Sequence, residues 1–157
     1  MPQKQIFKHD PSSGVFGDCY RTAVAVVLGV PANDVPHVCE KGEKNADDLD
    51  GLIAMRQFLR TKGLAISKSV YNGDLGWAAF RDWMQQFNPD TAIIVTGQSS
   101  RGVNHCVVMV GREVLCDPIT GESNDNPFLG AADVDGEKNW WVEAITPMIQ
   151  MEPKDAP

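Results

Sequence analysis

The hydrophobic pattern of the chain changes near Pro89. Before it, apolar residues recur at helical spacing in three segments, 19–28, 48–62 and 74–87. After it, β-branched and apolar runs indicate short strands at 91–96, 104–110, 114–116 and 139–145. An earlier run, 64–70, alternates partially and also indicates a strand. Helices at the front and strands at the back are typical of an α+β domain with an antiparallel sheet.

The length of the chain sets the number of domains. With 157 residues and 43% hydrophobic content, it can fill one core but is too short for two ordinary domains. We therefore predict a single domain over residues 1–150 and a frayed polar tail at 151–157. The third helix is expected to bury its apolar stripe, which consists of Trp77, Phe80, Trp83, Met84 and Phe87.

The charge of the chain excludes several classes of protein. A net charge of -7 and no stripe of Lys or Arg argue against nucleic-acid binding. No apolar run reaches the length of a membrane span, and no signal-peptide core follows the N-terminus, so we expect a soluble cytoplasmic protein. The four cysteines, at 19, 39, 106 and 116, have no close-pair spacing. We expect them to be free thiols.

The first helix begins at a cysteine. A turn-rich segment leads into Gly17, Asp18 and Cys19, and Gly29 is placed to end the helix after residue 28. Asp18 is the expected N-cap. A thiol at a helix N-terminus lies near the positive end of the helix dipole, which favours the nucleophilic thiolate. The Asp18 carboxylate works partly against this, because a nearby negative charge disfavours a second one.

A base and an orienting group for this thiol occur later in the chain. His105 lies near the start of the strand at 104–110, and Asp117 follows the next short strand. Because side chains alternate along a strand, the hairpin loop decides whether the two share a face. A three-residue loop at 111–113 makes them diagonal neighbours on one face, whereas a two-residue loop puts Asp117 on the other. The sequence permits both loops.

These features together resemble the papain-like cysteine peptidase superfamily, and most closely the small C39-like proteins of bacteria and phages. The resemblance rests on Gly-Asp-Cys at 17–19 opening a helix, followed by Asn-His-Cys-Val-Val at 104–108 and Cys-Asp-Pro at 116–118. It also includes the loop at 96–105 and covers most of residues 5–120. The implied fold is an N-terminal helix carrying the cysteine, packed on an antiparallel sheet that carries the histidine and the aspartate.

The resemblance also implies roles for individual residues. Cys19 would be the nucleophile, His105 the general base and later acid, and Asp117 the group that fixes the imidazole. The backbone N–H of Cys19 would be one oxyanion donor. Papain-like enzymes usually have a Gln about six residues before the nucleophile as a second donor, and this chain has Ser13 there, which makes Ser13 the candidate second donor. The candidate substrate contacts lie in and beside the loop before the histidine, at Gln98, Arg101 and Asn104.

The implied activity is that of a cysteine hydrolase acting on an amide bond, in a peptide or isopeptide, through a thioester intermediate. The expected partner is a protein or peptide substrate, with no cofactor, metal, nucleic acid or membrane. Acyl transfer or side-chain deamidation would use the same three residues with a different acceptor. A competing hypothesis is a papain-like binding protein without catalysis, such as a phage-borne factor that binds or inhibits a component in the host cytosol.

A structural zinc site is the third hypothesis. It would combine His37 and Cys39 with Cys106 and Cys116. The sequence disfavours it, because no C-x2-C motif is present and Cys106 projects to the strand face opposite His105. The three cysteines other than Cys19 are therefore interpreted as small buried hydrophobic residues.

Overall fold

The computed structural model describes residues 1–39 and 49–149. The predicted tail at 151–157 lies outside the described residues. Within them the helices are η1 (Pro11–Ser13, 3-10), α1 (Cys19–Leu28), η2 (Ala32–Asp34, 3-10), α2 (Leu49–Arg60) and α3 (Trp77–Phe87). The strands are β1 (Leu64–Asn72), β2 (Ala92–Gln98), β3 (Asn104–Val110), β4 (Glu113–Cys116), β5 (Gly130–Val134) and β6 (Glu137–Pro147).

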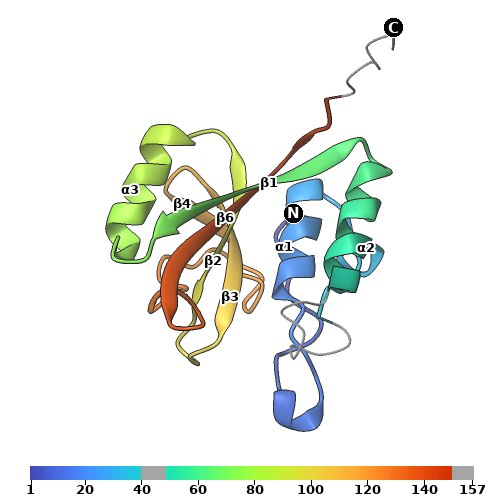
Figure 1. The fold of residues 1–157 in the computed structure, drawn as a ribbon, viewed down its shortest axis with the longest axis horizontal. Coiled ribbons are helices and arrows are strands. Elements are labelled where there is room, and N and C mark those ends of the chain that lie inside the picture. The colour runs from blue at the N-terminus through green and yellow to red at the C-terminus, as the bar shows by residue number, and fades with distance from the viewer. Residues whose placement is uncertain (40–48, 150–157) are drawn as a thin grey trace, which may run out of the picture.

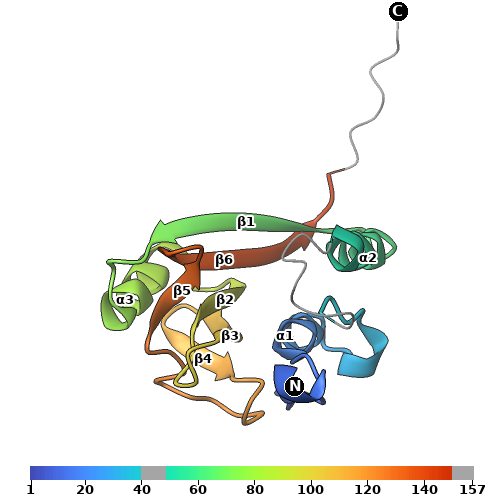
Figure 2. The same cartoon turned by 60° about the horizontal axis from the view of Figure 1, so that its bottom comes forward.

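The six strands form one sheet in the order β1-β6-β5-β2-β3-β4, and all neighbouring strands are antiparallel. Strand β6 also pairs with β2. Helix α3 lies on one side of the sheet, and α1 and α2 lie on the other (Figures 1 and 2). The predicted α+β class with an antiparallel sheet is confirmed.

Helix α1 has the predicted bounds, from Cys19 to Leu28. It ends because Gly29 adopts a left-handed conformation, with φ of 69°, and its N–H bonds back to the helix. Residues 21–25 of the helix are buried. Ala23, Val24 and Ala25 pack in a core with α2 and with Cys106 and Val108 of β3, so the first residue of the helix lies over the start of that strand.

The opposite core lies under α3. Phe80 and Met84 are fully buried there, together with Val107, Met109 and Trp140. The predicted apolar stripe is wrong for two of its five members, Trp83 and Phe87, which are exposed and pack on each other with ring centroids 4.6 Å apart. Trp83 lies about 60° around the helix from the buried stripe, and Phe87 is the last residue of the helix.

The hairpin between β3 and β4 has a two-residue loop. Val110 pairs with Glu113, so the three-residue loop considered from the sequence is wrong. The turns that are favoured in two-residue hairpins require a positive φ at their first central position. Gly111 occupies this position and has φ of 54°. Taken alone, this loop would put Asp117 on the face opposite His105.

A β-bulge reverses that consequence. Met109 pairs with Val114 but Val108 pairs with Cys116, so Leu115 is an extra residue on β4. Leu115 is 45% exposed, while Val114 packs in the core under α3 and Cys116 in the core under α1. The extra residue shifts the alternation by one position. Asp117 therefore returns to the face of β3 that carries His105.

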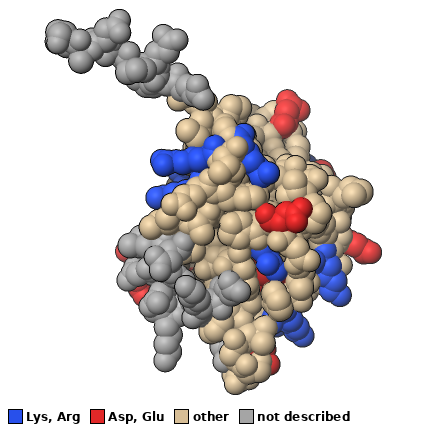
Figure 3. Space-filling model, turned by 90° about the vertical axis from the view of Figure 1, so that its right-hand side faces the viewer, with Lys and Arg blue, Asp and Glu red and all other residues tan. Residues whose placement is uncertain are grey.

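The surface over α2 carries both signs of charge (Figure 3). Lys and Arg side chains gather near the end of α2, where Arg60 lies in the last turn and interacts favourably with the helix dipole. Among the described helices, none has both the length and the apolar character needed to cross a bilayer.

Candidate functional site

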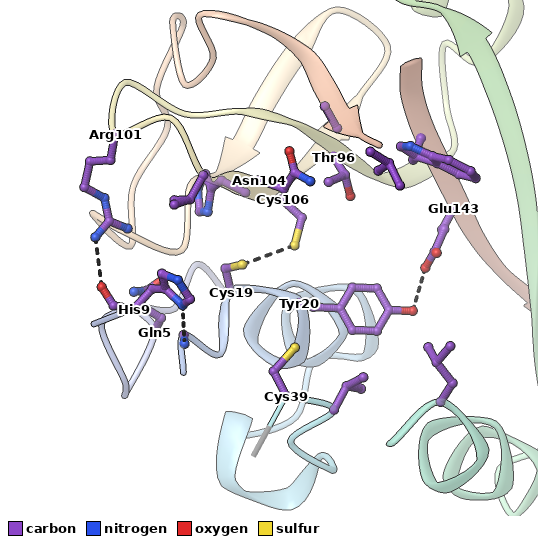
Figure 4. A pocket seen from close by; sticks show the side chains of 18 of the residues that line it. Gln5, His9, Cys19, Tyr20, Cys39, Thr96, Arg101, Asn104, Cys106 and Glu143 are labelled. Carbon is purple, nitrogen blue, oxygen red and sulfur yellow. Dashed lines mark hydrogen bonds between the residues drawn. The ribbon is translucent and has the colours of Figure 1, made fainter. Parts of the chain in front are cut away.

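A cavity of about 400 Å³ lies between α1 and the sheet (Figure 4). Its sheet side includes Trp141, Thr96 and Cys106, which are register partners on three adjacent strands. Cys19 and His105 line the same cavity. The first residue of α1 and the second residue of β3 thus line the same cavity, although they are far apart in sequence.

The Cys19 thiol has two interacting neighbours. Its sulfur lies 3.4 Å from that of Cys106, and it also interacts with the imidazole of His105 (Figure 4 shows the first contact). The hydrogen bond from Cys106 lowers the pKa of Cys19 most; burial opposes this, and His105 lowers it further. The net pKa lies well below that of an ordinary cysteine, so a thiolate is favoured.

His105 is held by Asp117. Nε2 of the imidazole lies 2.8 Å from Oδ1 of the carboxylate, and both side chains are buried. Burial opposes the charged imidazolium, but the hydrogen bonds to Asp117 and Cys19 outweigh it and raise the pKa of His105 to about 9. At neutral pH, the favoured state of the site is therefore a thiolate beside an imidazolium.

Asp117 is itself fixed by neighbouring donors. The backbone N–H of Ile119 donates to Oδ1 at 2.9 Å, and the Asn124 side chain donates to Oδ2 at 2.8 Å. Burial raises the pKa of Asp117, but the bonds from His105, Asn124 and Ile119 lower it below its ordinary value overall. The carboxylate therefore stays charged and keeps its orientation toward the imidazole.

Asp18 is the N-cap residue by position, but its side chain makes no capping bond. The buried carboxylate instead accepts hydrogen bonds from the backbone N–H groups of Ile6 and Phe7, and it pairs with Arg21 at 2.6 Å. The predicted cap is wrong in this respect. Because Arg21 balances its charge, Asp18 opposes the Cys19 thiolate less than expected.

Two of the candidate residues do not reach the cavity. The Ser13 hydroxyl is exposed and donates to the backbone oxygen of Asp10 within η1, so the prediction of Ser13 as an oxyanion donor lacks structural support. The Gln98 side chain donates to the backbone oxygen of Gly102 in the loop before β3. Neither lines the cavity around Cys19.

Arg101 and Asn104 do line the cavity. The Arg101 guanidinium donates to the backbone oxygen of His9 at 3.3 Å, which places a positive charge at the rim (Figure 4). The Asn104 amide exchanges two hydrogen bonds with the backbone of Asp133. Arg101 remains a candidate substrate contact, whereas Asn104 fixes the start of β3 to β5.

Gln5 was missed from the sequence. It lines the cavity together with Cys19, and its amide donates to the backbone oxygen of Phe7 at 3.1 Å. The N-terminal segment brings Gln5 to the cavity because the Asp18 carboxylate binds the backbone N–H groups of the next two residues, Ile6 and Phe7. No spacing rule within the sequence indicates this, since the position of Gln5 depends on how the N-terminal segment folds back over α1.

The far end of the cavity holds a polar network. The Tyr20 hydroxyl donates to Glu143 at 2.5 Å, and the Lys68 ammonium lies 2.7 Å from the other oxygen of the same carboxylate. Lys68 also lies over the Trp141 ring. Burial and the Glu143 charge raise the pKa of Tyr20 well above its ordinary value, so the phenol stays protonated.

Cys19, Cys106 and Cys116 are free thiols, as expected. Within residues 1–39 and 49–149, no group of three or more His, Cys, Asp or Glu side chains is arranged to hold a metal ion. Comparisons of the chain with protein-family models, with curated proteins and with solved structures found no match. The fold and the site thus define an α+β protein in which Cys19 and His105 line one cavity and Asp117 bonds to the imidazole of His105.

Proposed function

We propose that the chain is a papain-like cysteine hydrolase that cleaves an amide bond, in a peptide or isopeptide, through a thioester. Cys19 is the nucleophile, His105 the acid and base, and Asp117 the orienting group. The observation that carries the proposal is the single cavity shared by the Cys19 thiol and the His105 imidazole, with the imidazole held 2.8 Å from Asp117. A nucleophile, a base and an orienting group in this relation are what acyl transfer requires.

The reaction begins with attack of the Cys19 thiolate on the substrate carbonyl carbon. The His105 imidazolium then gives its proton to the leaving amine, the C–N bond breaks and a thioester forms. The thiolate charge helps to keep the pKa of His105 at about 9, so the pKa falls once that charge is lost. The neutral imidazole can then take a proton from water, which attacks the thioester and releases the acid and Cys19.

The oxyanion of each tetrahedral intermediate needs hydrogen-bond donors. The backbone N–H of Cys19, at the start of α1, is one, because the first N–H groups of a helix have no partner within the helix. The Gln5 amide is the second, in place of the expected Ser13, since it lines the same cavity as Cys19. Gln5 thus answers the objection that no Gln occurs near residue 13. The objection from the charge of Asp18 is weakened separately, because Arg21 balances that charge.

The test uses p-nitrophenyl acetate, an activated ester that acylates thiolates. We expect a stoichiometric burst of p-nitrophenolate and acetylated Cys19 by peptide mass spectrometry, at pH values below the ordinary cysteine pKa of about 8.5. Cys19→Ser and His105→Ala should abolish the burst. Cys116→Ala removes a buried thiol whose hydrogen bond goes to Gln3, so it should keep the burst.

The competing binding-protein hypothesis predicts a different result. Cys19 would then be acetylated no faster than Cys39, and the rate would not depend on His105. That outcome would contradict the hydrolase proposal. A positive burst would justify a screen of peptide and isopeptide substrates.

A further inference from the structure

Cys106 has no part in the reaction described above, yet its sulfur lies 3.4 Å from the nucleophile (Figure 4). It follows His105 on β3 and projects toward α1, where it is 4% exposed. From its sequence context alone, Cys106 is expected to be a small buried hydrophobic residue. A thiol so close to a second thiol is a hydrogen-bonding group, and its place beside Cys19 calls for a role of its own.

The surroundings of the two sulfurs decide which of them keeps its proton. Cys19 stands at the N-terminus of α1 and beside the His105 imidazolium, and both stabilise a negative charge. Cys106 packs with apolar side chains such as Ala23 and Val108, and the Glu143 carboxylate lines the same cavity. The hydrogen bond to Cys19, and after it burial, raise the pKa of Cys106 well above its ordinary value. Cys106 is therefore the donor, and Cys19 is the acceptor.

We propose that Cys106 is a positioning residue for the Cys19 nucleophile, and that its S–H donates a hydrogen bond that stabilises and orients the thiolate. The inference rests on the proposed function in that it concerns the same nucleophile. A neighbouring thiol stabilises the reactive thiolate in Cys-X-X-Cys motifs by comparable means. Here the two cysteines are 87 residues apart, and the fold brings them together.

This role has a specific consequence for the pH dependence of the site. Losing the donor lowers the fraction of Cys19 that is ionised, but only at pH values where ionisation is incomplete. At high pH the thiolate forms in any case, and a thiolate of higher pKa is slightly more nucleophilic. A purely structural role would instead reduce reactivity at every pH.

The experiment measures the rate of Cys19 alkylation by iodoacetamide from pH 5 to 10, by peptide mass spectrometry. The variants are Cys106→Ala, which removes the donor, and Cys106→Ser, which keeps a hydroxyl donor. Cys116→Ala is the matched control, because it removes a fully buried thiol from the same hairpin whose hydrogen bond goes to the Gln3 backbone. His105→Ala reports separately on the imidazole.

We expect Cys106→Ala to slow alkylation about tenfold on the acidic side, the equivalent of one pKa unit, and to leave the high-pH rate intact. Cys106→Ser should restore most of the acidic rate, and Cys116→Ala should match the wild type. The inference is overturned if Cys106→Ala matches Cys116→Ala, or if the serine variant behaves as the alanine variant does. Failure of the proposed function looks different, because the profile would then not respond to His105→Ala.

Discussion

At the scale of single residues, the site depends on a carboxylate that is fixed from three directions. Asp117 accepts bonds from His105, from the Ile119 backbone and from the Asn124 side chain. A carboxylate with so many donors cannot rotate without losing several hydrogen bonds, each worth about 1 kcal/mol or more. Nε2 of the imidazole therefore stays directed at Asp117, while the imidazole lines the cavity together with Cys19.

The proposed role of Gln5 as an oxyanion donor gives a prediction at the same scale. Gln5→Ala should slow acylation of Cys19 by p-nitrophenyl acetate by about 100-fold, because one preorganised donor is lost. Ser13→Ala is the comparison, since Ser13 occupies the expected sequence position but donates within η1. It should acylate at the wild-type rate. Equal rates for the two variants would exclude Gln5 as the donor.

At the scale of the elements, the sequence predicted most of the fold because the signals are local. The observed bounds of α1 and β3 match the predicted ones, because the helix stop at Gly29 and the β-branched run of β3 are signals that depend on only a few neighbouring residues. The strand β5, Gly130–Val134, was missed, because Gly-Ala-Ala-Asp-Val has little β propensity and is held by pairing with β6. Tertiary pairing decided its structure.

The same distinction applies to the site. Cys19 and His105 could be chosen from the sequence because a helix start and a β-branched run are local signals, whereas the face of Asp117 depends on the bulge at Leu115, which no local pattern indicated. Gln5 could not be chosen, because its place depends on the folded N-terminal segment. The contact of Cys106 with Cys19 was also missed, because it depends on how closely α1 packs on β3. Long-range packing carries no local pattern.

The bulge at Leu115 gives a prediction for the hairpin. Deleting Leu115 should leave the two-residue loop but return Asp117 to the face opposite His105, since the extra residue alone corrects the alternation. The pKa of His105 should then fall from about 9 by roughly one to three pH units, because the carboxylate partner is lost. The measurement is an NMR titration of the His105 ring.

Leu115→Ala is the matched control for this deletion. It keeps the extra residue and removes only a half-exposed side chain, so the pKa of His105 should stay near 9. Circular dichroism of both variants separates a local register change from unfolding. A folded deletion variant with an unchanged His105 titration would show that the bulge does not set the face of Asp117.

At the scale of the whole molecule, the N-terminal segment connects the two sides of the site. The Gln5 backbone donates to the oxygen of Pro118, next to Asp117 on the sheet side. The following two residues bind Asp18, next to Cys19 on the helix side. Gly17 allows this close approach, because a side chain there would come within 2.9 Å of His9. The segment thus holds the start of α1 next to Cys19 and the chain next to Asp117 in one arrangement.

This arrangement predicts that Asp18 matters for stability more than for chemistry. Asp18 is 1% exposed, and its neutralisation by Asp18→Asn would leave the buried Arg21 without its charge partner. We expect a loss of about 3 kcal/mol in the free energy of unfolding, measured by urea denaturation. Asp10→Asn changes an exposed carboxylate that bonds only within its own turn, so it should unfold as the wild type does. If both variants keep wild-type stability, the Asp18 carboxylate does not hold the N-terminal segment in place. The segment is then held by its backbone contact to Pro118 and by the Gln3 side chain, which bonds to the backbone of Val30 and Ala32.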